Sequence, residues 1–157
     1  MALKVEDYFA IQALLHNYPF LLDRGDFEGL GRMFARAKVF SGGQVMADCN
    51  PEQVASAFRD WLYIYEDGTP RTRHCIANVI IEPESDTRAI LKSYVMVFQQ
   101  TPVLPLQPII GGDYRDTVAK IDGEWCFVAR HIGNDLVGNL HAHGRDVAVI
   151  RSMRANG

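Results

Sequence analysis

Apolar residues in the first part of the chain return at helical spacing. From Val5 to about Asp23 they recur every three or four positions, which predicts one amphipathic helix, or two helices joined at Pro19. A proline there removes a backbone donor and should kink the helix near its end. Asp26 then stands where the cap of a second short helix is expected, over about residues 27–34.

A third helix is expected to begin at Asn50, because this capping residue is followed by Pro51 at the first helical position. Its apolar stripe continues to Tyr65, so we expect the helix to stop near Gly68. Before it, residues 38–47 surround a glycine pair, which indicates a weak hairpin or an irregular pair of strands.

From Thr69 onward the apolar period changes to that of strands, which are predicted at 72–82, 87–100, 109–121 and 124–132. The predicted connections are a turn at 83–86, a proline-rich loop at 101–108 and a hairpin turn at Asp122-Gly123. Helices followed by antiparallel strands favour an α+β fold, in which the N-terminal helices pack in the concave face of a curved, mostly antiparallel sheet. We expect one domain over residues 1–157. In its tail, from 133, the apolar residues Val147, Val149 and Ile150 fit a last strand or a docked arm.

The predicted strand at 72–81 is the segment on which the rest of the interpretation depends. Alternation places His74 and Asn78 on one face, among isoleucines. Both faces are largely apolar, so we expect the strand to be covered on both sides. A buried imidazole needs a partner, and the simplest interpretation is a core histidine bonded to a carbonyl or a carboxylate.

Asp23 is a candidate for that partner, because it ends the apolar face of the first helix, where the helix dipole disfavours a carboxylate. Asp23 is either an ordinary carboxylate at the helix end that points to solvent, or it faces the sheet. In the second case it would bond one nitrogen of His74 and leave the other as a base. Tyr18 is either a core aromatic residue or, if Pro19 distorts the last turn, a hydroxyl beside Asp23. Arg130 is either solvated or paired, or it faces a pocket and stabilises negative charge there.

Composition narrows the function classes. The 157 residues carry a net charge of −3 and no basic run, which argues against a nucleic-acid partner. No segment has the length and apolarity of a signal peptide or a membrane span, so we expect no membrane partner. Three cysteines without metal-type spacing indicate reduced thiols in a cytoplasmic protein.

Two further histidines, His141 and His143, would point the same way on a strand and could contribute to a metal site. No third ligand stands near them in the sequence, so we expect no metal. The glycine pairs lack the strand–turn–helix context of a phosphate loop, and no motif indicates a nucleotide, a flavin or any other cofactor.

Several segments together resemble the SnoaL-like members of the NTF2-like superfamily. They span about residues 5–132 and keep the order typical of that family, namely Ile11 to Leu30, Arg73-His-Cys-Ile-Ala-Asn-Val79, Gly112-Asp-Tyr-Arg-Asp116 and Asp122-Gly-Glu-Trp-Cys-Phe-Val-Ala-Arg130. The sequence is most similar to the branch that holds scytalone dehydratase, lindane dehydrochlorinase and bile-acid 7α-dehydratase.

This resemblance implies a catalytic dyad of Asp23 and His74, with Tyr18 as a hydroxyl in the pocket and Arg130 as its arginine. The histidine four residues before Asn78 also fits the family. Two features of scytalone dehydratase are missing, since Leu22 stands where that enzyme has a tyrosine, and Gly111-Gly112 occupy the region of its second histidine.

The expected function is a cofactor-independent lyase, of dehydratase or dehydrohalogenase type, for a small hydrophobic cyclic molecule. Alternatives that use the same pocket are a double-bond isomerase, a polyketide cyclase, a non-catalytic small-molecule-binding protein and the β-subunit of a ring-hydroxylating dioxygenase. We expect the substrate to contact Asn78, Trp61, Tyr65, Tyr114 and Phe98. The apolar outer face of the sheet predicts a homodimer or homotrimer.

Overall fold

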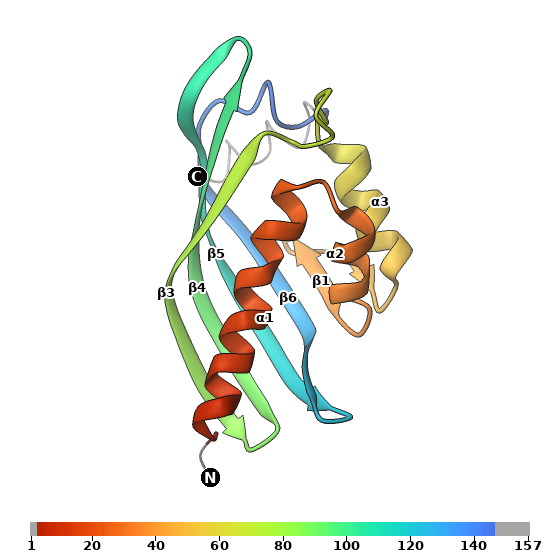
Figure 1. Ribbon diagram of the computed structural model, residues 1–157, viewed down its shortest axis with the longest axis vertical. Helices are drawn as coiled ribbons and strands as arrows, with labels where there is room; N and C mark the ends of the chain where they lie inside the picture. Colours follow the sequence, from red (N-terminus) through yellow and green to blue (C-terminus); the bar gives the residue numbers. More distant parts are fainter. Residues whose placement is uncertain (1–2, 147–157) are drawn as a thin grey trace.

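Three helices cover one face of a curved sheet in the computed structural model, which describes residues 3–146 (Figure 1). The helices are α1 (Val5–Asp23), α2 (Phe27–Met33) and α3 (Pro51–Trp61). The strands are β1 (Lys38–Ser41), β2 (Gln44–Asp48), β3 (Thr72–Ser85), β4 (Arg88–Thr101), β5 (Leu104–Ile121) and β6 (Glu124–Val137). Their order in the sheet is β2-β1-β6-β5-β4-β3, and every neighbouring pair is antiparallel except β1 with β6. The predicted α+β fold is confirmed.

Local signals in the sequence account for several of these boundaries. The Asp26 carboxylate accepts the backbone N–H of Gly29 and begins α2, and the Asn50 side chain accepts two N–H groups at the start of α3. Asp122 and Gly123 both have positive φ and close the hairpin between β5 and β6. The first helix continues as one element through Pro19 to Asp23.

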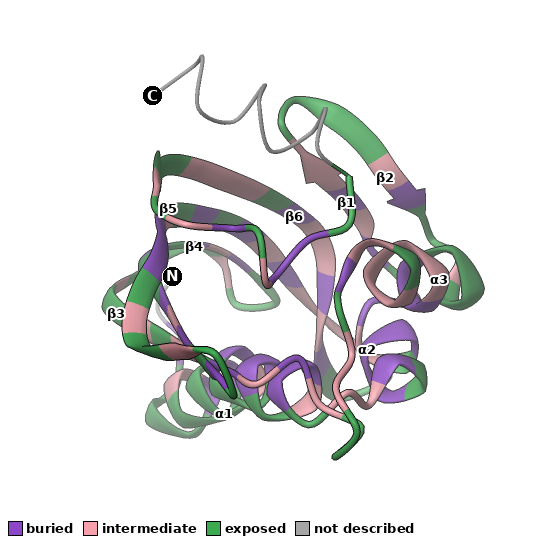
Figure 2. Ribbon diagram, turned by 90° about the horizontal axis from the view of Figure 1, so that it is seen from above, coloured by how far each residue is buried: buried purple, intermediate pink, exposed green. Residues whose placement is uncertain are grey.

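The core lies between the helices and the concave face of the sheet. Figure 2 colours the ribbon by burial and shows buried positions in the helices and in the strands of the sheet. One stripe of α1, with Ile11, Leu15 and Leu22, packs toward inward-facing strand residues such as Val97 and Phe127. At its open end this layer leaves room for the cavity described below.

The prediction that residues 72–81 are covered on both sides is wrong. These residues belong to β3, which is the edge strand of the sheet and has one face exposed to solvent. The regular alternation also fails, because the pairing with β4 shifts between Ala77 and Ile80, where Asn78 has a φ of 54°. Beyond this bulge Asn78 is exposed and Val79 takes the inner face.

Other boundaries also differ from the prediction. The strand expected to end at 82 continues to Ser85, so the turn expected at 83–86 begins only at Asp86. The third helix ends at Trp61 rather than near Gly68, because Leu62 is extended and pairs with Gly144. The region 101–108 is mostly strand rather than loop, and its prolines are tolerated because β6 pairs with β5 only from Ile110 onward. The last strand, β6, runs on to Val137. The predicted strand or arm at Val147, Val149 and Ile150 lies outside the described residues.

Within the described part of the chain, none of the helices combines the length and apolarity needed to cross a membrane. The three cysteines are free thiols, of which Cys49 and Cys75 are exposed.

Candidate active site

Asp23 and His74 meet at the end of α1. The carboxylate oxygen Oδ1 lies 2.7 Å from Nδ1 of His74 and accepts a second hydrogen bond of 2.7 Å from the Thr72 hydroxyl. The other oxygen, Oδ2, accepts the backbone N–H of His74 at 2.9 Å. Both side chains are buried, with 7% of Asp23 and 8% of His74 exposed. Three donors from β3 therefore fix the carboxylate, which in turn fixes the imidazole.

This geometry sets the protonation of the pair. Burial acts to raise the pKa of Asp23, but the hydrogen bonds and charge of His74 and the Thr72 hydroxyl outweigh it, so the pKa is lowered. An ionised Asp23 accepts a hydrogen bond from Nδ1–H of His74, which leaves Nε2 with a lone pair. Such an arrangement can act as a general base, with the tautomer of the imidazole held by the carboxylate.

His74 lines a cavity of about 350 Å³ between the helices and the sheet. Its wall is mainly apolar, and the aromatic residues Tyr18, Tyr114 and Trp61 contribute to it. The rings of Tyr18 and His74 meet edge to face with centroids 6.2 Å apart, and those of Tyr18 and Tyr114 at 5.8 Å. A largely apolar cavity with a few polar groups on one side is typical of sites for small hydrophobic ligands.

Burial determines the protonation of the Tyr18 and Tyr114 hydroxyls. It raises the pKa of Tyr18, and it raises the pKa of Tyr114 well above its ordinary value, although the nearby Arg130 charge acts in the opposite direction on both. Both hydroxyls therefore stay protonated near neutral pH and can donate hydrogen bonds.

Arg130 lies behind the tyrosines and does not line the cavity. Its Nε and one terminal nitrogen bind both oxygens of Asp116, each at 2.7 Å, and neither side chain is exposed. The guanidinium stacks over the rings of Tyr18 and Tyr114, 4.3 and 4.4 Å from their centroids. Burial acts to lower the pKa of Arg130, but the charge and hydrogen bonds of Asp116 outweigh it. The pKa is therefore raised, and the group stays charged. Arg130 therefore reaches the cavity only through the tyrosines.

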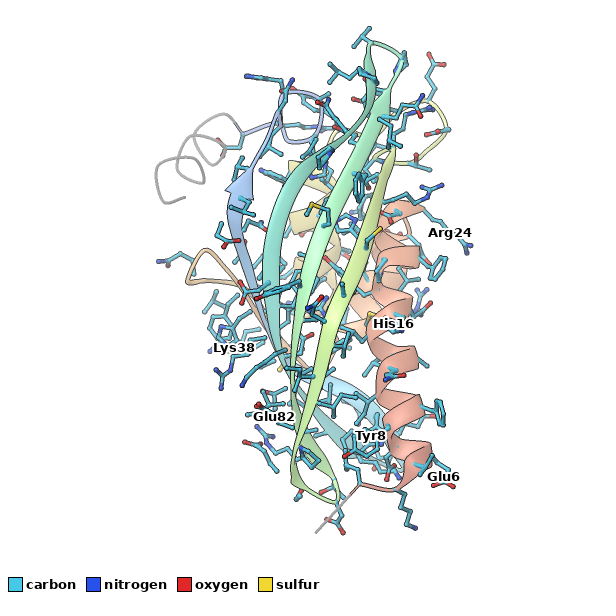
Figure 3. All side chains as sticks on the ribbon, turned by 90° about the vertical axis from the view of Figure 1, so that its left-hand side faces the viewer. Glu6, Tyr8, His16, Arg24, Lys38 and Glu82 are labelled. Atoms are coloured by element: carbon cyan, nitrogen blue, oxygen red, sulfur yellow. The ribbon has the colours of Figure 1, made fainter. Side chains whose placement is uncertain are left out.

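Three other predicted contact residues lie outside the cavity wall. The hydroxyl of Tyr65 donates to the backbone oxygen of Ala142 at 2.7 Å. Phe98 lines a separate groove between the end of α1 and β3, which also borders the Asp23–His74 pair. The groove also contains Arg24, whose position Figure 3 shows. Asn78 is exposed at the bulge of β3 and lines neither space.

The comparison with known families now decides the classification. The family model of the SnoaL-like domain matches residues 4–131. The chain belongs to the SnoaL-like family. No curated protein matches it by sequence.

Solved structures of other proteins share the fold of this SnoaL-like chain. A scytalone dehydratase candidate from Novosphingobium aromaticivorans is 23% identical, with a TM-score of 0.69 over 87% of this chain and 89% of that one. ActVI-ORFA from Streptomyces coelicolor is 17% identical, with a TM-score of 0.69 over 83% and 98% of the two chains. LinA is 18% identical, with a TM-score of 0.69 over 87% and 91%.

Sequence reasoning missed the role of Thr72, whose hydroxyl binds Asp23, and it also missed His143. His143 is 3% exposed and lines the cavity, whereas His141 is exposed, so the two do not point the same way as they would on a strand. They lie in a turn rather than a strand. Among residues 3–146, no cluster of three or more His, Cys, Asp or Glu side chains could hold a metal ion. The i, i+2 spacing predicts that both side chains point the same way on a strand, and nothing in the sequence indicates the turn that separates them.

Proposed function

We propose that this SnoaL-like protein is a cofactor-independent lyase that eliminates water or halide from a small hydrophobic cyclic substrate. The observation that carries the proposal is the buried pair of Asp23 and His74 at the edge of an apolar cavity. A carboxylate held by three donors is well suited to stabilise the imidazolium that forms when His74 takes a proton.

The reaction begins with proton removal from a ring carbon next to an electron-withdrawing group. Nε2 of His74 takes the proton, the C–H electron pair forms the new double bond, and the bond from the neighbouring carbon to the leaving group breaks with its electrons. When the leaving group is hydroxide, the proton on His74 completes a water molecule and returns the base to its neutral form. When it is halide, the halide leaves as an anion and the proton on His74 passes to solvent water. Asp23 keeps its charge throughout and balances the imidazolium.

Tyr18 would hydrogen-bond the substrate oxygen or the departing group. Its raised pKa suits this role, because a protonated phenol can donate to an oxygen on which negative charge develops. Arg130 supports the same charge from behind the ring of Tyr18, since its guanidinium lies on the ring face and its carboxylate partner fixes it there.

Turnover by dyad variants tests the proposal. A panel of cyclic β-hydroxy ketones and chlorinated cyclohexanes is offered to the protein, and the new double bond is followed by absorbance and mass spectrometry. On a substrate that is turned over, Asp23→Asn and His74→Gln should each lower kcat by about 10²- to 10⁴-fold, the usual contribution of a positioned base. Exposed His16→Gln on α1 serves as the matched control and should leave kcat unchanged.

Full turnover by either dyad variant would show that the mechanism is wrong. A product with the same mass as the substrate and a shifted double bond would instead identify an isomerase, in which His74 returns the proton to another carbon.

A further inference from the structure

The segment after β6 contributes His143 to the cavity wall and is held there by hydrogen bonds. It crosses from the end of the sheet toward α3 (Figure 1). Its Ala142 carbonyl accepts hydrogen bonds from the Tyr65 hydroxyl and from the side chain of Gln99. The His143 carbonyl accepts the backbone N–H of Tyr63, and the N–H of Arg145 binds the carbonyl of Trp61. The backbone is therefore fixed on both sides of His143.

Two polar atoms of this part of the wall have no hydrogen-bond partner among the described residues. They are Nδ1 of His143 and Nε1 of Trp61, and both are buried. The two rings are in edge-to-face contact with centroids 5.1 Å apart, and both side chains line the cavity. A buried unpaired polar group costs about 1–3 kcal/mol, and both atoms belong to residues that line the cavity, so a bound group that satisfied both would be favoured.

The chemistry of the two atoms specifies that group. An indole N–H can only donate, whereas a neutral imidazole protonated on Nε2 presents a lone pair at Nδ1. Burial is the main cause that lowers the pKa of His143 to about 3, so this imidazole is neutral. A hydroxyl group accepts one hydrogen bond and donates another, which matches this pair. A carbon-bound halogen has no proton to donate and would leave Nδ1 unpaired.

We propose that Trp61 and His143 form a hydroxyl-binding subsite, so that the cavity takes hydroxylated hydrophobic rings. This inference rests on the proposed function and deepens it, because it selects the dehydratase reaction over dehydrohalogenation. His143 acts here by binding substrate, while His74 acts on the proton.

Binding of two matched probes tests the subsite without any turnover. The alcohol 1-tetralol and its parent hydrocarbon tetralin are titrated into the protein by calorimetry. Trp61→Phe and His143→Leu should each weaken binding of 1-tetralol by about 3- to 10-fold, the value of one neutral hydrogen bond, and should change binding of tetralin less than twofold. In the double variant the losses should be less than the product of the single losses, because one hydroxyl serves both residues.

Matched controls separate this role from packing. His141→Leu alters the exposed histidine two residues away and should leave both affinities unchanged. His143→Asn places an amide near the position of Nδ1 and should restore part of the preference for the alcohol. Each variant is first shown to be folded by its urea denaturation curve.

Equal losses for the two probes would assign Trp61 and His143 to packing alone and overturn the subsite. Unchanged binding of 1-tetralol in both single variants, or no binding of either probe to the wild-type protein, would also overturn it. These results are independent of the dyad, because Asp23→Asn and His74→Gln turnover decides the lyase proposal separately.

Discussion

Asp23 illustrates how a locally unfavourable residue acquires its place. It lies at the end of α1, where the helix dipole disfavours a negative charge, and three hydrogen-bond donors from β3 compensate. Two of these donors, the Thr72 hydroxyl and the imidazole, belong to side chains that are themselves buried. The carboxylate thus joins the first helix to the edge strand of the sheet.

At this scale, Tyr18→Phe separates hydrogen bonding from packing. The ring remains in contact with His74, Tyr114 and the Arg130 guanidinium, so the fold should be unaffected. On a substrate that is turned over, kcat should fall by about 10- to 100-fold, as expected for the loss of a hydrogen bond to developing charge of about 1.5–3 kcal/mol. Steady-state kinetics measures this, and an unchanged kcat would remove Tyr18 from the mechanism.

The Arg130–Asp116 pair gives a prediction about stability. Arg130→Met leaves a carboxylate with no exposed surface uncompensated, which should lower the free energy of unfolding by about 3–5 kcal/mol. Adding Asp116→Leu removes the orphaned charge and should recover most of that loss. Urea denaturation of the two variants measures both values. Equal stability of the single and double variants would contradict this account of the pair.

The residues of the site were only partly accessible to sequence reasoning. Asp23 and His74 stood out because a carboxylate at a helix end and an imidazole in an apolar strand both need partners, and the structure joins them. Asn78 could not be placed, because a positive φ at a non-glycine residue interrupts the alternation. His143 depends on contacts with a segment about eighty residues earlier, for which no local pattern exists.

Among the secondary-structure elements, α1 is held at both ends. Near its start, Asp7 accepts hydrogen bonds from Lys120 on β5 at 2.8 Å and from the indole of Trp125 on β6 at 2.9 Å. These bonds, with that of Lys120 the largest influence, lower the pKa of Asp7 from 3.8 to about 2. The carboxylate at the far end, Asp23, binds β3. Two acidic residues therefore fix the helix across the sheet.

Because the pKa of Asp7 is depressed in the folded state, its contribution to stability is complete above 3.8 and disappears as the pH falls toward 2. The difference in unfolding free energy between the wild-type protein and Asp7→Asn should therefore be constant near neutral pH and shrink over that acidic interval. Urea titrations at a series of pH values measure it. Glu6→Gln, an exposed carboxyl in the same turn (Figure 3), is the control, and a difference that stayed constant down to pH 2 would contradict the prediction.

Elements were easier to predict where their ends carry their own chemistry. Asp26, Asn50 and the Asp122-Gly123 turn each satisfy backbone groups or a required φ locally, and each begins or ends an element as expected. The end of α3 at Trp61 was missed, because what stops the helix is pairing with Gly144, far along the chain. The edge position of β3 is likewise a property of the strand order.

For the molecule as a whole, the outer face of the sheet carries exposed apolar side chains. Met96 on β4 and Leu136 on β6 both pair with Gly111 of β5, so these exposed residues lie in one row across the sheet. Figure 3 shows this face of the sheet toward the viewer. Exposed apolar clusters of this kind favour association. We propose, in keeping with the expectation from the sequence, that the protein forms a homodimer or homotrimer through this face.

Light scattering after size-exclusion chromatography tests this proposal. Met96→Lys combined with Leu136→Lys should convert the oligomer to a monomer and leave the circular dichroism spectrum unchanged. Phe20→Lys, which changes an equally exposed apolar residue on α1, should leave the mass unaltered. A monomeric wild-type protein would show that the proposal is wrong.

The attachment of the segment after β6 has a consequence for biosynthesis. The base, the tyrosines and the rest of the cavity wall all precede this segment in the chain, and the ribosome therefore produces them first. A nascent chain that has emerged only as far as β6 still lacks His143 and with it one part of the cavity wall. The wall is therefore complete only after residues 143–145 have been made and have bonded to the backbone of Tyr63 and Trp61.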